Sequence, residues 1–138
     1  MNHFVKMLAS VDLFKGLSRR EVKEIAEAGK QVEFGAGERF VEAGLQASDF
    51  YLIVDGQAML SVPKKPDRLL GPGDSFGEIS VLDGGPRTAT VTAETQVLTF
   101  RLDRQHFERL LDDHGSIGRK ILVEMCGRLR YAESRMEG

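Results

Sequence analysis

Residues 76–91 read FGEISVLDGGPRTATV and place two opposite charges, Glu78 and Arg87, towards the two ends of one short segment. The run GEISVLD can form one short helical turn that opens at Gly77, where backbone N–H groups without helical partners would point at an anion. The glycines of DGGPR permit a reversal of the chain, which would return Arg87 towards those amides. An arginine fork that faces exposed amides suits a phosphate. An ionised Glu78 only accepts hydrogen bonds and suits a ligand hydroxyl. A phosphate with a hydroxyl nearby indicates a nucleotide.

A second interpretation of the same pair needs no ligand. Glu78 and Arg87 could form an exposed salt bridge with each other, which would contribute only ~0–1 kcal/mol. The two residues by themselves leave both interpretations open.

The composition narrows the class of protein. The chain has 138 residues and a net charge of −2, with one cysteine, Cys126, and no apolar run long enough to span a membrane. This length suits one domain with its own core. The charge does not favour a nucleic-acid-binding surface, the lone cysteine cannot form an intrachain disulfide, and the N-terminus is too polar for a signal peptide. The sequence therefore predicts a cytoplasmic globular protein.

Both ends of the chain are predicted to be helical. Residues 1–29 carry apolar side chains at helical spacing, and Ser18–Glu21 (SRRE) fits a capping box at the start of a second short helix. Residues 103–138 predict two further helices, the first of which ends at Gly115. The longer, last helix carries an apolar stripe at three- and four-residue spacing: Ile117, Ile121, Met125, Leu129, Ala132 and Met136.

The middle of the chain, residues 30–102, is predicted to be β-structure. Short apolar segments alternate with glycines, and Asp55-Gly56 fits a tight hairpin turn. Phe50, Leu52 and Val54 alternate with other residues as in a half-buried antiparallel strand. Many short strands at regular turn spacing favour a sandwich or a jelly-roll barrel.

No pattern in the sequence predicts catalysis or a metal site. The three histidines, His3, His106 and His114, are far apart and lie outside the predicted strands. One cysteine cannot build a thiolate metal site, and Cys126 is interpreted as a packing residue. No GxSxG motif frames a serine, and the glycines of Gly71–Gly77 follow no phosphate-loop spacing. We expect no enzymatic activity, no metal and no cofactor.

Residues 76–91 closely resemble the phosphate-binding cassette of cyclic-nucleotide-binding domains. This family occurs in the catabolite activator protein, in regulatory subunits of cyclic-AMP-dependent kinase and in cyclic-nucleotide-gated channels. The residues that fit the cassette pattern are Phe76, Gly77, Glu78, Ile79, Ser80, Leu82, Pro86, Arg87, Thr88, Ala89 and Val91. The likeness extends to LFKGLSRREVKEIA and to EFGAGERFVEAGLQASDFYLIVDGQAMLSV. It implies one domain over 1–138, an eight-stranded jelly-roll β-barrel with N-terminal helices, a short cassette helix and two C-terminal helices.

The resemblance also implies roles for individual residues. Arg87 would pair with the cyclic phosphate, together with backbone amides near Ser80 and Thr88. Glu78 would accept from the ribose 2′-hydroxyl. Arg128, in the last helix, would stack on the purine with ~1 kcal/mol of cation–π energy, or else be a solvated helix arginine. The expected ligand-binding residues are Gly77, Glu78, Ile79, Ser80, Arg87, Thr88, Ala89 and Arg128.

We therefore expect a non-catalytic sensor of cyclic AMP or cyclic GMP, with the choice of base left open by the sequence. Binding would rearrange the cassette and the last helix and so signal to an effector protein, without direct nucleic-acid contact or a membrane span. The stripe of the last helix would form a homodimer or pack on its own barrel. Two alternatives are the sensor half of a longer transcription regulator and a degenerate domain that binds proteins without a ligand.

Overall fold

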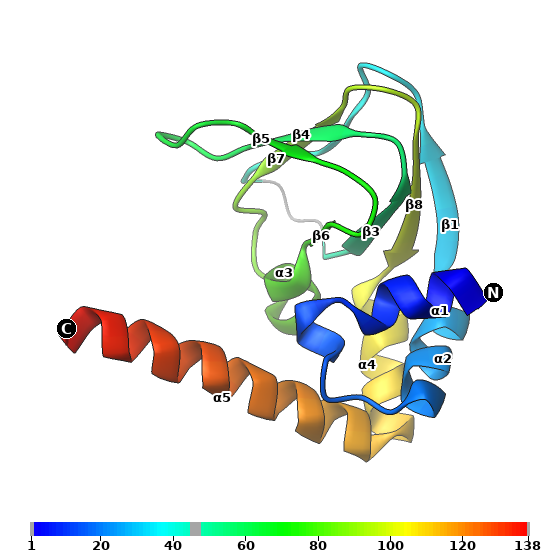
Figure 1. The fold of residues 1–138 in the computed structure, drawn as a ribbon, viewed down its shortest axis with the longest axis vertical. Coiled ribbons are helices and arrows are strands. Elements are labelled where there is room, and N and C mark those ends of the chain that lie inside the picture. Colours follow the sequence, from blue (N-terminus) through cyan, green and yellow to red (C-terminus); the bar gives the residue numbers. More distant parts are fainter. Residues whose placement is uncertain (1, 45–47, 138) are drawn as a thin grey trace.

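The structure is a computed structural model that describes residues 2–44 and 48–137, with side chains over 4–44 and 48–136. Its elements (Figure 1) are α1 (Asn2–Ala9), a 3-10 turn η1 (Asp12–Phe14), α2 (Arg19–Ala28), β1 (Lys30–Phe34), β2 (Arg39–Val41), β3 (Phe50–Asp55), β4 (Ala58–Ser61), β5 (Arg68–Leu70), β6 (Ser75–Phe76), α3 (Glu78–Asp83), β7 (Thr90–Ala93), β8 (Val97–Leu102), α4 (Arg104–Asp113) and α5 (Gly115–Glu137). The expected mainly β fold with flanking helices is confirmed.

The strands form two antiparallel four-stranded sheets, in the orders β1-β8-β3-β6 and β2-β7-β4-β5. β4 pairs with β5, β3 with β6, β2 with β7 and β1 with β8. The chain thus folds back on itself from the β4–β5 hairpin outward, as in a jelly roll, an architecture of two sheets. Within the described strands no ladder joins one sheet to the other, so the predicted closed barrel is not confirmed.

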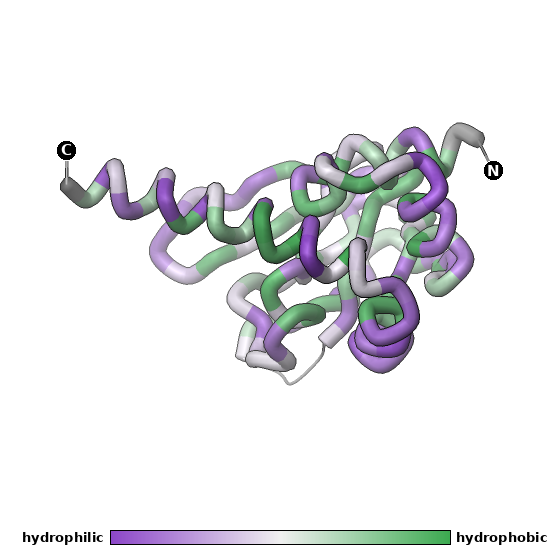
Figure 2. The backbone as a smooth tube through the Cα atoms, turned by 90° about the horizontal axis from the view of Figure 1, so that it is seen from below, coloured by the Kyte–Doolittle hydropathy of each residue, from purple (hydrophilic) through white to green (hydrophobic). Residues whose placement is uncertain are grey.

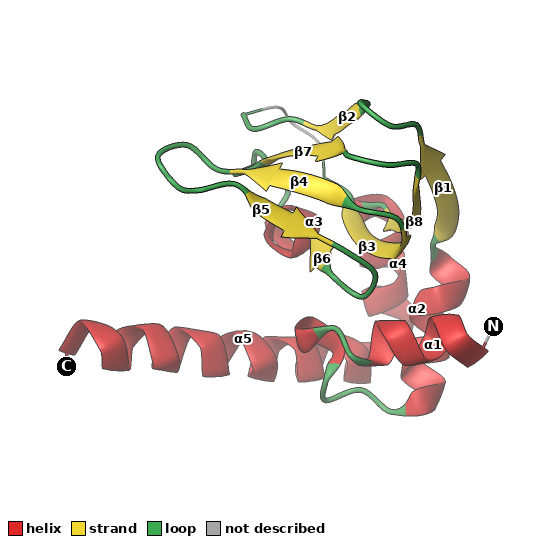
Figure 3. Ribbon diagram, turned by 45° about the horizontal axis from the view of Figure 1, so that its top comes forward, coloured by secondary structure: helices red, strands yellow, loops and turns green. Residues whose placement is uncertain are grey.

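The core has two parts, and β3 contributes to both. Phe50 and Leu52 pack with the helices, whereas Tyr51 and Ile53 pack between the sheets. Figure 3 shows α1, α2 and α5 together on one side of the strands. All four side chains are therefore buried, each stabilising the fold by about 1.5–3 kcal/mol. The prediction of a half-buried strand was wrong for β3, because a local sequence cannot show that helices cover its second face.

The capping box at the start of α2 is confirmed. The backbone N–H of Glu21 donates to the Ser18 hydroxyl, and the N–H of Ser18 donates to Oε1 of Glu21. The same carboxylate accepts from Lys120 Nζ at 2.7 Å and from the Ser116 hydroxyl, both in the first turns of α5. These bonds, of which the one from Lys120 has the largest effect, lower the pKa of Glu21 from 4.5 to about 2. Glu21 therefore ties the N-terminal helices to the base of α5.

Replacing Glu21 with glutamine is expected to lower the free energy of unfolding at pH 7 by about 1–2 kcal/mol. Because the folded-state pKa is depressed, this contribution is complete above pH 4.5 and is lost as the pH falls towards about 2. Urea unfolding at a series of pH values measures it. The wild-type and Glu21→Gln curves should converge in acid, and curves that remain parallel would contradict the assignment.

The C-terminal helices differ from the prediction at their junction. α4 ends at Asp113, and the N–H of His114 donates to the carbonyl of Leu110. Gly115, predicted to end this helix, is instead the first residue of α5. The short step of one residue between the helices leaves no room for a glycine turn.

The predicted stripe of α5 divides between two environments. Ile117 and Ile121 are buried against the other helices, whereas Leu129 is 61% and Met136 is 86% exposed. Figure 1 shows that the C-terminal half of α5 projects away from the rest of the chain. Apolar and polar segments alternate along that half (Figure 2). None of the described helices combines the length and the apolar character that a membrane span requires.

Candidate functional site

The cassette predicted from residues 76–91 is built around a helix with a left-handed glycine at each end. Gly77 precedes α3 with φ +87°, and Gly84 follows it with φ +73° and donates to the carbonyl of Ser80. Both values lie where residues with a Cβ are disfavoured. The glycines thus allow the chain to enter α3 abruptly from β6 and to leave it towards Arg87.

Arg87 lies deep in the site. Only 5% of the residue is exposed, and its Nε and Nη1 have no hydrogen-bond partner among the described residues. Burial lowers the pKa of the guanidinium, opposed by the charge of Asp49. A desolvated guanidinium with unused donors is costly unless an anion meets it. Its surroundings therefore suit a negatively charged ligand group.

A cavity of about 250 Å³ lies beside Arg87. Seven of the eight predicted site residues line it: Gly77, Glu78, Ile79, Ser80, Arg87, Thr88 and Ala89. The fold therefore brings the two halves of the cassette to one concave surface. Ile79 is 56% exposed at its edge, and Phe76 both lines the cavity and belongs to the core between the sheets.

Arg128, the eighth predicted residue, is not among the cavity-lining residues. Its Nη1 lies 3.1 Å from Oε1 of Glu78 and donates a hydrogen bond to it. Glu78 is thus paired across to α5 and not with Arg87, which is against the interpretation of an exposed Glu78–Arg87 salt bridge. This contact joins the cassette directly to the last helix.

The apolar wall of the cavity was missed by the sequence reasoning. Val41 of β2, Leu60 of β4, Val62 just after β4 and Val91 of β7 line it together with Ser75. Leu60 pairs with Val91 across the ladder, so their side chains share a face. The alternation of these strands was visible in the sequence, but which face meets the cassette depends on the pairing. This wall offers a surface for a flat, apolar ligand part such as a base.

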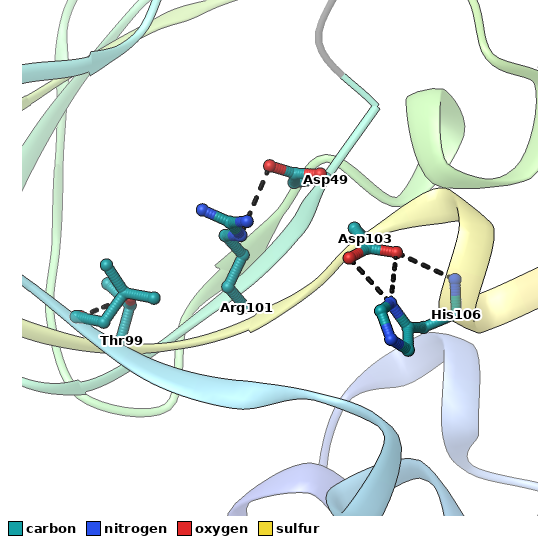
Figure 4. A network of polar contacts seen from close by, with 6 residues as sticks. Asp49, Thr99, Arg101, Asp103 and His106 are labelled. Atoms are coloured by element: carbon teal, nitrogen blue, oxygen red, sulfur yellow. Dashed lines mark hydrogen bonds and ion pairs between the residues drawn. The ribbon is translucent and has the colours of Figure 1, made fainter.

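Polar contacts near the site tie β3 and β8 to neighbouring elements (Figure 4). Arg101 Nε lies 3.5 Å from Oδ2 of Asp49. Asp103 caps α4 by accepting from the N–H of His106 and also contacts its ring. Burial is the largest single influence and raises the pKa of the Asp103 carboxyl, but the hydrogen bonds from His106 and the charges of His106 and Arg101 together outweigh it and lower the pKa. Arg101 and His106 thus have partners within the protein, Asp49 and Asp103, that explain their positions without a ligand.

The histidines and the cysteine considered as possible metal ligands do not form a site among the described residues. His114 lies 3.4 Å from Glu24, and the side chain of His3 lies outside the described part of the chain. Cys126 is exposed on α5 and is not the packing residue that was predicted. Over the described ranges, no group of three metal-ligating side chains comes together.

Comparison with known proteins bears on this site. The family model of the cyclic nucleotide-binding domain matches residues 31–114, which include the whole cassette. A CRP-like cAMP-activated global transcriptional regulator of Mycobacterium tuberculosis (strain CDC 1551 / Oshkosh) is 26% identical over 137 residues, which are 95% of this chain and 61% of that protein.

Two solved structures share the fold. The N-terminal domain of a transcriptional regulator from Streptomyces coelicolor A3(2) is 27% identical, with a TM-score of 0.83 and 94% of each chain covered. The Thermus thermophilus Catabolite Activator Protein is 26% identical, with a TM-score of 0.72, over 92% of this chain and 62% of that one. The chain thus spans under two thirds of the length of the Mycobacterium and Thermus proteins. Since the family model matches more than half of the chain, the chain belongs to the cyclic nucleotide-binding domain family.

Proposed function

We propose that this chain is a non-catalytic sensor of a cyclic nucleotide, cyclic AMP or cyclic GMP, that acts in the cytoplasm. The observation that carries the proposal is the buried Arg87, which lines the same cavity as Glu78 and whose Nε and Nη1 have no hydrogen-bond partner among the described residues. A cyclic phosphate would supply the missing acceptor. The one cysteine of the chain agrees with a reducing compartment.

Each residue of the cassette has a role in this proposal. Arg87 takes the phosphate together with backbone amides near Ser80 and Thr88, and Glu78 accepts from the ribose 2′-hydroxyl. Gly77, Ile79 and Ala89 line the cavity, and the missing side chain of Gly77 and the small one of Ala89 let the backbone approach the sugar and the phosphate. The base lies on the apolar wall of the cavity.

Isothermal titration calorimetry with cyclic AMP and with cyclic GMP tests this function. Saturable heat with at least one of them is expected, and 5′-AMP serves as the control because it keeps the purine and loses the cyclic phosphate. Lack of heat with either cyclic nucleotide at millimolar concentration would favour a degenerate domain that acts in protein interaction.

The signal passes to α5 through the pair of Glu78 and Arg128. A ribose hydroxyl and the Arg128 guanidinium both use the Glu78 carboxylate, so nucleotide binding changes the contact that holds α5 to the cassette. A ligand shifts such an equilibrium by its differential affinity for the two arrangements. An effector protein that contacts the projecting half of α5 would read the change.

Replacing Arg128 with glutamine is expected to change nucleotide affinity by less than about tenfold, because a half-exposed ion pair contributes only ~0.2–1 kcal/mol. Amide exchange in α5 beyond residue 128 should become faster in the variant. Calorimetry and hydrogen exchange measure the two effects. Unchanged amide exchange in α5, together with a loss of affinity of about fivefold as expected for ~1 kcal/mol of stacking energy, would instead place Arg128 on the base.

The exposed face of α5 forms a homodimer in this proposal. Leu122, Cys126, Leu129 and Met136 are exposed and recur at coiled-coil spacing, whereas Ile117 and Ile121 are used within the chain. A second copy offers the same seam and covers it symmetrically. In this proposal, dimerisation and packing within the chain, the two alternatives that the sequence left open, use different faces of α5.

Replacing Leu129 with glutamate is expected to weaken the dimer by about 30-fold or more, because the charge would be buried in the seam. Sedimentation equilibrium measures the dissociation constant. Glu124→Gln is the matched control on another face of the helix. A wild-type chain that stays monomeric at a concentration of about 100 micromolar would refute the dimer.

A second candidate function is the sensor part of a longer transcription regulator. It is favoured by the Mycobacterium relative, a transcriptional regulator of which the chain spans 61%. Expression of the chain with whatever coding sequence follows residue 138, and a DNA-binding assay with and without cyclic nucleotide, would distinguish this role from signalling through a separate effector.

A further inference from the structure

The guanidinium of Arg87 lies over an aromatic ring, a contact that the cassette pattern does not include. Its Cζ is 5.9 Å from the ring centroid of Tyr51, within the range of a cation–π interaction. Both residues are 5% exposed, so water screens the contact little. Tyr51 is in β3, far from the cassette in sequence, and meets Arg87 only through the fold.

The sheet holds the Tyr51 ring in one place. Tyr51 pairs with Phe76 of β6 on one side and with Arg101 of β8 on the other. Its ring stacks on Phe76 with centroids 5.4 Å apart and meets Phe40 edge-on at 5.6 Å. Rings packed from several directions have little freedom to rotate. The surface under Arg87 is therefore rigid.

Arg87 has no acidic partner in the part of the chain that the structure describes, where no ion pair includes it. Asp49 raises the pKa of Arg87 through its charge, but its carboxylate lies 3.5 Å from Nε of Arg101. Burial raises the pKa of the Tyr51 hydroxyl, so the phenol stays neutral at pH 7. Arg87 thus rests on an uncharged ring.

An aromatic support and a carboxylate act differently on an arginine. A carboxylate takes up the N–H donors and cancels the charge, so that a phosphate must displace it. A ring contacts the guanidinium by its π-face and leaves donors at the edge of the fork available. Nε and Nη1 of Arg87 are buried, and no hydrogen bond within the described residues uses them.

We propose that Tyr51 is a positioning residue for Arg87, holding the buried guanidinium in place for an anion without using its hydrogen-bond donors. The identity of that anion as a cyclic phosphate rests on the proposed function. The position of Arg87 over the Tyr51 ring is independent of that function.

The test compares Tyr51→Leu with Tyr51→Phe. The leucine variant loses the ring and should bind the cyclic nucleotide about tenfold more weakly in calorimetry. The phenylalanine variant keeps the ring and should bind within about threefold of the wild type. Phe14→Leu is the control, because Phe14 packs edge-on against Phe50 in the part of the core beside the helices. It should destabilise the fold and leave affinity unchanged.

A measurement without nucleotide separates this proposal from the proposed function. In nitrogen-15 NMR spectra, the ring current of Tyr51 should shift the Arg87 Nε–H resonance upfield in the wild type and in Tyr51→Phe, and the shift should vanish in Tyr51→Leu. If the wild type binds no cyclic nucleotide but the shift is present, the function is wrong and the positioning role stands. Equal affinity in all Tyr51 variants, or an Arg87 resonance that Tyr51→Leu does not move, overturns the role of Tyr51.

Discussion

Replacing Arg87 with alanine is expected to weaken cyclic nucleotide binding by about 100-fold or more. The substitution removes charged hydrogen bonds to the phosphate, each of which contributes ~1.5–3 kcal/mol. The fold should remain, because Arg87 forms no ion pair within the described residues. Its removal should shift the thermal midpoint by less than about 4 °C. Calorimetry and thermal unfolding measure the two quantities.

Two further substitutions sharpen this test. Arg87→Lys keeps the charge and loses the planar fork, so its affinity should fall between those of the wild type and of Arg87→Ala. Arg39→Ala removes an exposed arginine of the same domain, whose side chain is 60% exposed, and should leave affinity unchanged. Nearly unaltered binding by Arg87→Ala would exclude Arg87 as the phosphate ligand.

Replacing Gly77 with alanine is expected to lower the free energy of unfolding by about 3–5 kcal/mol and to abolish binding. An added Cβ would collide with Nη1 of Arg87 and with the backbone oxygen of Asp49. The backbone at φ +87° also disfavours any side chain. The new methyl would thus displace Arg87 and strain the start of α3. Urea unfolding and calorimetry measure the outcome.

Gly37 provides a matched control for Gly77. It has the same φ of +87°, but apart from its two neighbours in the chain no described residue has an atom within 4 Å of an added Cβ. Gly37→Ala should therefore show only the backbone strain of ~1–2 kcal/mol. The difference between the two variants isolates the crowding around Arg87. Equal losses of stability in both would show that Gly77 is needed only for its backbone angle.

Local patterns were good predictors where neighbouring residues decide the structure. The capping box of Ser18 and Glu21 formed as predicted, because its donors and acceptors lie within one turn. The order of helices and strands followed the change in apolar periodicity. The end of α4 was predicted less well, since a glycine can stop one helix or begin the next, and Gly115 is the first residue of α5.

The cassette is the clearest case of a site readable from the chain alone. Residues 76–91 contain both charges, the glycines and the small side chains, so the predictions of a nucleotide ligand and of Arg87 as its anion-binding residue rest on one continuous segment. The residues that contact that segment cannot be predicted from it. Tyr51 beneath Arg87, Arg128 on Glu78, and the apolar wall of Leu60 and Val91 come from elements far away in the sequence. Strand pairing and helix docking bring them together, and both depend on the whole core and not on local pattern.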